Sequence, residues 1–446
     1  MKVHGWRALQ TGLPGAVSCA LCFAFLVAPA SAQAISELAK NLDPAFATNL
    51  TNPRDIPAAL TFATGATQAG DIESAISTYD RLLFYNPNLS SVRFQLGSLY
   101  YRLGSYGQAR AYFESALRMR DITPELRQQA EEYIVAIDKK LAPDQFSGFA
   151  QTGVRYQTNA SLGPGPQAIL ASGQTFDGRF FARPDWNWFG AFALNYVHDF
   201  GTQYGNTFET SIIGYDAQQF ALHQFDLGLL ELRAGPRFGL PEIGNGASIK
   251  PYAVATGSLL ADTPYSGGIG GGLTVHFNAG NVALDPYVEV VQQGYRNSSF
   301  YPLASGLAGT LETYAFQASG PVAPSVSWQA RIAFAHDDTV FDPYSYNSFA
   351  ADLWLPWNFT LPWYPYAWTI TPSVGVTDWR YKAPDPTIDP NVAQHSVAWR
   401  LALGLDIPIR NLFTFGVLLQ YSSVASNLPV FSMRDLAVTL GPTVKF

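Results

Sequence analysis

The sequence predicts an α+β protein of two parts, an N-terminal α-helical solenoid followed by an antiparallel transmembrane β-barrel of about fourteen strands. Residues 56–141 have the apolar spacing of helices and repeat with an offset of 34 residues. Residues 146–446 alternate apolar and polar side chains with period two, between clusters of turn residues. Charged residues are only 14% of the chain, below the roughly 25% of soluble globular proteins.

Residues 1–32 are predicted to be a secretory signal peptide. Lys2 and Arg7 form its basic start, an apolar centre follows, and a small-residue cleavage site ends at Ala32. A polar lead-in segment is expected at 33–55. After this leader no apolar run reaches the about 20 residues that a membrane-spanning helix needs, so a membrane crossing is expected to use strands.

The two cysteines and the charge balance exclude several kinds of site. Cys19 and Cys22 both fall inside the predicted leader, so the mature chain is expected to have no disulfide and no thiolate metal site. The chain carries 27 basic and 34 acidic residues and offers no basic stripe for phosphates. We therefore expect no nucleic-acid partner.

Two copies of a helix pair follow the lead-in, within residues 56–141. Small residues at matched places let neighbouring helices approach closely, and large residues fill the seam between them. These motif positions are Gly70, Ala75, Tyr79 and Pro87 in the first copy and Gly97, Tyr100, Gly104, Ala109, Phe113 and Ala116 in the second. The pattern resembles a pair of tetratricopeptide repeats, and residues 124–141 are expected to add a capping helix with a polar outer face. The module is expected either to bind a peptide on its concave face or to act as a structural buttress.

Fourteen alternating segments make up the predicted barrel. They are 146–158, 186–199, 206–219, 226–238, 248–260, 264–278, 282–294, 308–320, 324–337, 347–360, 366–380, 394–408, 411–424 and 431–446. Most exceed the about 9–11 residues that a tilted strand needs to cross the hydrocarbon core. With both termini in the periplasm, connections after odd-numbered strands should be long and external, and the others should be tight turns. Most connections follow this rule.

The last of these segments has the clearest membrane alternation. Leu436 and Leu440 fall on one face of an extended strand, and Asp435 and Thr439 fall on the other. The segment ends on Phe446, which resembles the terminal aromatic signal by which outer-membrane barrels are recognised for insertion. We therefore expect two partners of the barrel, the barrel assembly machinery and outer-membrane lipid.

The charged residues of the barrel are expected to line its interior, because an Arg that faces lipid at the bilayer midplane costs about 2–4 kcal/mol. Those that share the polar face of their segments are Glu231, Arg233, Arg237, Asp285, Glu289, Arg400 and Asp406. Their mixed signs favour a mesh of salt bridges that stiffens the barrel over a selective permeation path.

Aromatic residues gather around one predicted periplasmic turn. They are Trp354, Trp357, Trp363, Tyr364, Tyr366 and Trp368. Amphipathic rings suit the membrane interface, so a girdle is favoured over a sugar-binding ladder.

The sequence predicts no enzyme, no cofactor and no metal centre. The histidines after the leader are scattered over different segments, and no spacing of Ser or Asp indicates a catalytic group. Asp337, Asp338 and Asp342 in one predicted outer loop have the oxygen ligands that calcium prefers, but a solvated loop is the favoured interpretation.

The order of parts, leader, two helical repeats and fourteen-strand barrel, is similar to that of the surface lipoprotein assembly modifier family. The opening strand at 153–159 and the closing segment at 421–427 add to the resemblance. It implies a barrel that helps to carry a surface protein across the outer membrane, with the repeats meeting this client in the periplasm. The layout also looks like that of exopolysaccharide exporters of the cellulose and poly-N-acetylglucosamine systems, whose repeat arrays are longer and whose barrels are usually larger. A third interpretation is an outer-membrane scaffold with a closed lumen.

Overall fold

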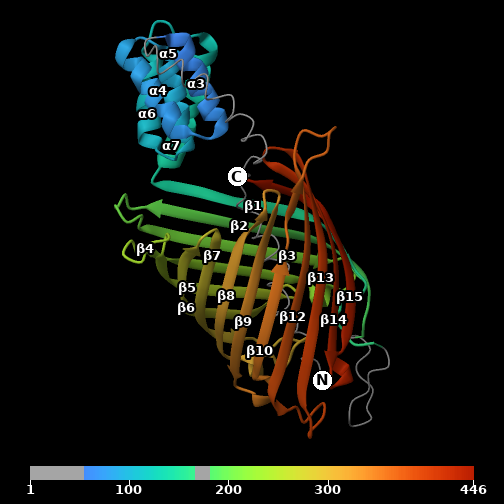
Figure 1. Ribbon diagram of the computed structural model, residues 1–446. Coiled ribbons are helices and arrows are strands. Elements are labelled where there is room, and N and C mark those ends of the chain that lie inside the picture. Colours follow the sequence, from blue (N-terminus) through green and yellow to red (C-terminus); the bar gives the residue numbers. More distant parts are fainter. Residues whose placement is uncertain (1–54, 166–180) are drawn as a thin grey trace. The chain divides into compact units, whose positions relative to one another are not determined.

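The computed structural model describes residues 55–165 and 181–446, which form two compact units (Figure 1). The helical unit ends at Gln145 and the barrel unit begins at Phe146. The predicted signal peptide and all but the last residue of the predicted lead-in lie outside the described residues. In the described part of the chain, no helix is both long and apolar enough to cross a membrane.

The helical unit contains two helix pairs and a final helix. These are α3 (Ile56–Ala69) and α4 (Ile72–Tyr85), α5 (Ser90–Arg102) and α6 (Tyr106–Leu117), and α7 (Pro124–Leu141). The side chain of Asp55 accepts a hydrogen bond from the backbone N–H of Ala58 (3.1 Å) and so caps the start of α3. Gly70 ends α3 with a φ of 85°, a left-handed conformation that glycine adopts without steric cost.

Small residues bring the helices of each pair together. Ala75, Ala109 and Ala116 are fully buried. Gly97 on α5 lies under the ring of Phe113 on α6, where an added Cβ would come within 2.8 Å of that ring. The seam therefore has no room for a larger residue at position 97.

The remaining motif positions have distinct places in the helical unit. Tyr79 is buried on α4, and Gly104 adopts a left-handed φ of 76° between α5 and α6. Tyr100 stacks on Tyr112 with ring centroids 5.4 Å apart. Pro87 lies in the α4–α5 connection, where its carbonyl accepts a hydrogen bond from the Arg93 guanidinium.

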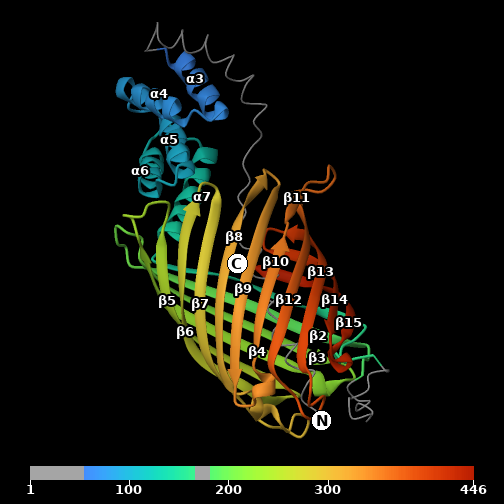
Figure 2. The same cartoon turned by 60° about the horizontal axis from the view of Figure 1, so that its bottom comes forward.

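The barrel is a single antiparallel sheet that closes on itself (Figures 1 and 2). Its strands are β1 (Asp144–Gln157), β2 (Asp185–Asp199), β3 (Thr207–Gln219), β4 (Leu227–Gly239), β5 (Ser248–Leu260), β6 (Thr263–Ala279), β7 (Val282–Tyr295), β8 (Gly309–Ala323), β9 (Val326–Thr339), β10 (Tyr346–Trp354), β11 (Trp357–Phe359), β12 (Trp368–Pro384), β13 (Ala393–Arg410), β14 (Phe413–Ser426) and β15 (Met433–Lys445). The last strand, β15, pairs with β1 and completes the ring.

Strands β10 and β11 are two parts of one interrupted strand. Both lie between β9 and β12: Trp354 is opposite Gln329 of β9, and Trp357 is opposite Val326 of the same strand. Pro356 falls in the gap, where a residue without a backbone N–H cannot continue the ladder. The barrel thus has fourteen strands, and the predicted fold class is confirmed.

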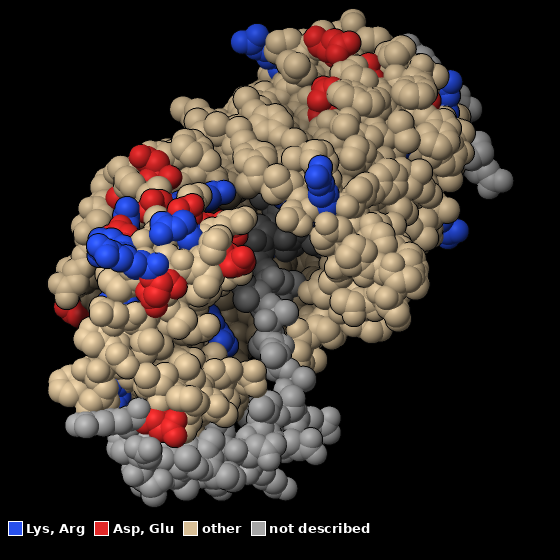
Figure 3. Space-filling view, turned by 90° about the horizontal axis from the view of Figure 1, so that it is seen from above, with Lys and Arg blue, Asp and Glu red and all other residues tan. Residues whose placement is uncertain are grey.

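Side chains alternate between the outside and the inside of the barrel. Leu419 and Tyr421 on β14 are exposed on the outer surface, whereas Gln420 between them lines an interior cavity. On β15, Leu436 is exposed outside and Thr439 lines the same cavity. Figure 3 shows one face of the molecule, on which charged side chains gather over the helical unit and wide areas elsewhere are uncharged. This is the surface of an outer-membrane-type barrel.

The two ends of the barrel differ in their connections. At the end where β1 stops and β2 starts, which we call the loop end, most connections are long, and several contain short 3-10 helices: His223–Phe225, Ala304–Leu307, Asp342–Tyr344 and Pro429–Phe431. At the opposite end, the turn end, several strands are joined by tight turns such as 280–281 and 411–412. Most connections follow the predicted alternation, and exceptions include 261–262, which is short at the loop end, and 240–247, which is long at the turn end.

Candidate functional site

The lumen of the barrel is the candidate functional site, because cross-strand pairing gathers polar side chains there from strands far apart in sequence. Arg233 on β4 lies opposite Ser211 of β3 and Val254 of β5, and these residues share the inner face. The alternation of each strand carries this inner face around the ring. The structure places all seven charged residues of the predicted polar face on it.

Arg233 is the centre of one group of ion pairs in the lumen. Its guanidinium lies 2.5 Å from Glu231 Oε1 on the same strand and 3.0 Å from Glu289 Oε2 on β7. The hydroxyl of Tyr252 on β5 also donates to Glu289 (3.0 Å). One cation thus pairs with two carboxylates, which leaves the group a formal net charge of −1, and Glu289 also accepts a hydrogen bond from a phenol.

A second group lies nearer the turn end. Glu209 on β3 receives hydrogen bonds from Arg237 Nε on β4 (2.5 Å) and from Lys250 Nζ on β5 (2.8 Å). Arg237 also donates to the hydroxyl of Ser248 (2.9 Å). This group has two cations and one carboxylate, a formal net charge of +1, which is opposite to the −1 of the Arg233 group.

Other lumen pairs complete the mesh. Asp285 lies 2.7 Å from His276 Nδ1, and Arg400 Nη2 lies 2.7 Å from Asp352 Oδ1. Arg331 Nη2 donates to the hydroxyl of Tyr287 (2.9 Å). The sequence interpretation did not include the partners Glu209, Lys250, Asp352, His276 and Arg331. Strand parity could have identified them. Once one residue of a strand is assigned to the inner face, every second residue of that strand lies on the same face.

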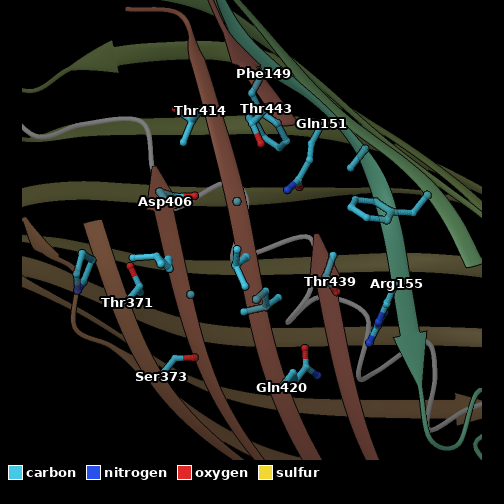
Figure 4. Close-up of a pocket in the computed structure, with 18 of the residues that line it drawn as sticks. Phe149, Gln151, Arg155, Thr371, Ser373, Asp406, Thr414, Gln420, Thr439 and Thr443 are labelled. Carbon is cyan, nitrogen blue, oxygen red and sulfur yellow. The ribbon is translucent and has the colours of Figure 1, made fainter. Parts of the chain in front are cut away.

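A different wall of the lumen is rich in hydroxyl and amide groups. Figure 4 shows these side chains pointing into a common space from β1 and from β12 to β15. We call them the unpaired wall: Gln151, Arg155, Thr371, Ser373, Asp406, Thr414, Gln420, Thr439 and Thr443. Arg155 Nε and Thr371 Oγ1 are buried and have no hydrogen-bond partner among the described residues. Asp406 is thus the one member of the seven predicted charged residues that lies outside the ion-pair mesh.

Aromatic rings border the same cavity. Phe149 on β1, Phe189 on β2 and Tyr215 on β3 line one side of it, and Trp354 at the end of β10 lines the other. Trp354 is buried, so its assignment to the membrane girdle is wrong. Its place on the inner face follows from the parity of β10, in which Asp352 and Trp354 point the same way.

The other aromatic residues of the predicted girdle lie at the turn end. Trp363 and Tyr364 are in the connection before β12, and their rings contact that of Trp368. Trp363 is 72% exposed. Exposed amphipathic rings at a barrel end are typical of a membrane interface.

Apolar side chains occupy the loop end of the lumen. One cluster combines inward side chains of β4 to β7 with residues of the loop-end connections: Ala160, Leu222, Phe225, Leu227, Leu260, Tyr265, Tyr295, Tyr301, Ala304, Leu307 and Tyr344. A second cluster on the opposite side contains Tyr346, Trp379, Ala398 and Val424. A third, in the connections themselves, contains Ile388, Leu428 and Val430. We call these three clusters the apolar cap.

Tyr301 is the central side chain of the apolar cap. It is fully buried, and its hydroxyl donates to the backbone carbonyl of Gln224 (3.0 Å) from another loop-end connection. Burial raises the pKa of Tyr301, with a smaller contribution from Tyr265. The ring and its hydrogen bond therefore hold two connections together over the lumen.

The acidic residues considered for calcium have other partners. Lys382 Nζ lies 2.9 Å from Asp342 and 3.7 Å from Asp338. Asp337 lies on the inner face of β9 and is buried. These contacts account for the two exposed carboxylates without a metal ion.

Phe446 forms the last backbone pair of the barrel seam. Its N–H donates to the carbonyl of Gly148 (3.1 Å), and the N–H of Gly148 donates to the Phe446 carbonyl (3.0 Å). Its predicted role as an insertion signal stays a prediction.

In the helical unit, a tyrosine and a carboxylate connect the two repeats. The hydroxyl of Tyr112 on α6 donates to Asp80 Oδ1 on α4 (3.1 Å). Burial and the negative charge of Asp80 raise the pKa of Tyr112 to about 12. The bond spans the seam between the first pair of helices and the second.

The known proteins that are similar to this chain match either the helical unit or the barrel unit. Residues 90–122 match the family model described as tetratricopeptide repeat, which covers α5 and α6. No curated protein matches the chain. Among solved structures, a tetratricopeptide repeat protein from Parabacteroides merdae is 21% identical over 24% of this chain, with a TM-score of 0.22, and only 41% of that protein is covered. The type III secretion chaperone SycD of Yersinia enterocolitica, in complex with a peptide of the translocator YopD, is 15% identical over 29% of this chain and 95% of its own (TM-score 0.23).

The barrel unit has its own similar structures. The outer membrane channel DcaP of Acinetobacter baumannii is 10% identical over 68% of this chain and 97% of its own (TM-score 0.38). A bacterial polysaccharide outer membrane secretin is 11% identical over 67% and 98% (TM-score 0.33). These are similarities of fold only. The repeat prediction is confirmed for the second copy, and the chain joins a tetratricopeptide repeat to a closed fourteen-strand barrel of the outer-membrane type.

Proposed function

We propose that this protein is an outer-membrane conduit that carries a macromolecular client to the cell surface or helps to display it there. In this proposal the helical unit lies in the periplasm and receives the client. The barrel lies in the outer membrane, where it has been inserted by the barrel assembly machinery. The protein performs no chemistry on the client.

The observation that carries the proposal is a barrel with a polar lumen and an apolar outer surface, joined in one chain to tetratricopeptide repeats. Polar groups inside a closed barrel suit a hydrated path. Repeat modules of this type offer an extended surface for chains that a lone barrel does not have. A scaffold without transport would need neither feature.

The first candidate client is a surface protein, as the resemblance to surface lipoprotein assembly modifiers implies. The second candidate is an exopolysaccharide, and one observation favours it. The unpaired wall carries seven hydroxyl or amide side chains, and the charged residues of the same cavity are Arg155, Asp406 and Lys445. The lumen therefore offers more neutral hydrogen-bonding groups there than charges.

Deletion of residues 56–141 from the full chain tests the proposal. The barrel should still fold, as seen by its heat-modifiable migration in gel electrophoresis. A specific surface protein should then accumulate in the periplasm if proteins are the client, or surface polysaccharide should fall if glycans are. Unchanged surface proteins and unchanged polysaccharide with a folded barrel would contradict transport and leave the scaffold interpretation.

A further inference from the structure

The lumen has two kinds of polar surface, which differ in how their groups are satisfied. The charged side chains on β3 to β7 bond to one another, as in the group formed by Glu209, Arg237 and Lys250. In the unpaired wall, by contrast, Arg155 Nε and Thr371 Oγ1 are buried without a hydrogen-bond partner among the described residues. Groups that bond only to water remain available to a ligand, whereas groups within a mesh are not.

Thr371 distinguishes the unpaired wall from a polar surface whose groups are all hydrated. Thr371 is 7% exposed, its side chain faces the cavity (Figure 4), and its Oγ1 is buried without a hydrogen-bond partner in the part of the chain that the structure describes. A buried hydroxyl without a hydrogen-bond partner is unfavourable, because it has lost its water and gained nothing in return. Ligand-binding sites retain such groups because a bound molecule satisfies them.

The chemistry of the wall indicates the class of ligand. Thr371, Thr439 and Gln420 each both donate and accept hydrogen bonds, which matches a molecule with many hydroxyl groups. The rings of Phe149 and Trp354, on the border of the same cavity, offer flat apolar faces for the C–H faces of sugar rings. An ordinary polypeptide has roughly one quarter charged residues and would find few partners on this wall.

We propose that the unpaired wall is a binding site for a neutral glycan chain inside the lumen. This inference specifies the chemical class of the client in the proposed function. It rests on that function only in taking the lumen as the path of the client. The hydroxyl and amide groups bind the sugar hydroxyls, the bordering rings stack on sugar faces, and the ion-pair mesh keeps the other side of the lumen rigid.

The test uses the purified full-length mature protein in detergent micelles and isothermal titration calorimetry. The probes are cellohexaose, chitohexaose and a neutral glycine–serine peptide of similar length. At least one oligosaccharide should bind, and Thr439→Val and Gln420→Leu, which remove a hydroxyl and an amide at nearly constant volume, should each weaken binding about tenfold. Tyr287→Phe removes a hydroxyl from the ion-pair mesh and is the matched control, with an expected change below twofold.

Each other outcome overturns the inference. Failure of both oligosaccharides to bind, an equal loss with Tyr287→Phe, or tighter binding of the peptide than of either sugar would exclude a glycan site on this wall. Heat-modifiable migration in gel electrophoresis shows whether each variant is folded. If Gln420→Leu does not fold, Thr439→Val, which is the milder change, still tests the inference. The binding result is independent of the export assay. If a sugar binds in micelles but deletion of 56–141 changes no surface component, the glycan site stands and the proposed transport function is refuted.

Discussion

Asp352 and Arg400 form an ion pair of 2.7 Å although their strands are not neighbours, because their side chains meet over Gly375 of the intervening β12. A Cβ at Gly375 would overlap with Asp352 Oδ1 and would lie 2.9 Å from Arg400 Nη2. Tyr252 reaches Glu289 in the same way across Gly272 of β6. At these two places, a glycine on the inner face of the intervening strand allows side chains of non-adjacent strands to meet.

Gly375→Ala should separate Asp352 from Arg400 and destabilise the barrel by about 1–3 kcal/mol, since each charge loses its partner in a confined space. The measurement is the temperature at which the folded band disappears in unboiled gel electrophoresis. Gly404→Ala is the control, because a Cβ there makes only ordinary contacts with Thr371 and Leu418. Equal transition temperatures for the two variants would show that the bridge does not stabilise the barrel.

Single cysteines should report the inner and outer faces of β14 and β15. The sequence has no cysteine after Cys22. Cys at Gln420 or Thr439 should react with a water-soluble maleimide in intact outer membranes, and Cys at Leu419 or Leu436 should not. The reverse pattern would mean that these strands are shifted by one residue, which exchanges the two faces.

Tyr301→Ala should open the apolar cap. Loss of a fully buried ring removes the contacts that hold the loop-end connections together, at a cost of about 3–5 kcal/mol. We expect a several-fold increase in single-channel conductance in planar bilayers. Phe300→Ala removes a neighbouring ring that is 43% exposed and should leave conductance unchanged. A conductance of Tyr301→Ala equal to that of the parent protein would show that the cap does not restrict the lumen.

Gly97→Ala and Gly107→Ala should have opposite effects on the helical unit. A Cβ at Gly97 comes within 2.8 Å of the Phe113 ring, whereas a Cβ at Gly107 meets nothing within 4 Å. The first change should destabilise by about 1–3 kcal/mol through overpacking, and the second should stabilise by about 0.4–1 kcal/mol. Thermal loss of the helical circular dichroism signal at 222 nm measures both. A stabilising Gly97→Ala would contradict the close seam.

The stability of the helical unit should fall as the pH rises from 10 to 12. Tyr112 has a folded-state pKa of about 12, above its unfolded value of about 10, so the unfolded chain releases its proton first. Its contribution is fully present below pH 10 and is lost as the pH rises through the folded pKa. Tyr112→Phe should remove this part of the alkaline loss of the 222 nm signal, and Tyr85→Phe, at a 44% exposed ring, should not. Identical alkaline profiles for Tyr112→Phe and the parent would exclude this linkage.

Local periodicity determined much of this protein from its sequence. The 34-residue offset specifies which residues are small at the helix seams, as Gly97 and Phe113 show. Alternation with period two assigns an inner face and an outer face to each strand, and the turn clusters between segments are enough to count fourteen strands. These patterns depend on neighbours in the chain, which is why they can be read without a structure.

Only the tertiary structure decided which inner side chains meet. Arg233 and Glu289 are 56 residues apart, and their contact depends on the register of four strands and on Gly272 of β6, which lies opposite Glu289. The cluster of aromatic residues around Trp354 in the sequence predicts a place in the girdle, but the parity of β10 puts its side chain on the inner face. Asp406 looks like its charged companions in sequence, yet among the described residues it forms no ion pair within 4.0 Å. Closure of the ring and the registers of non-adjacent strands set these contacts, and neither is encoded within a single segment.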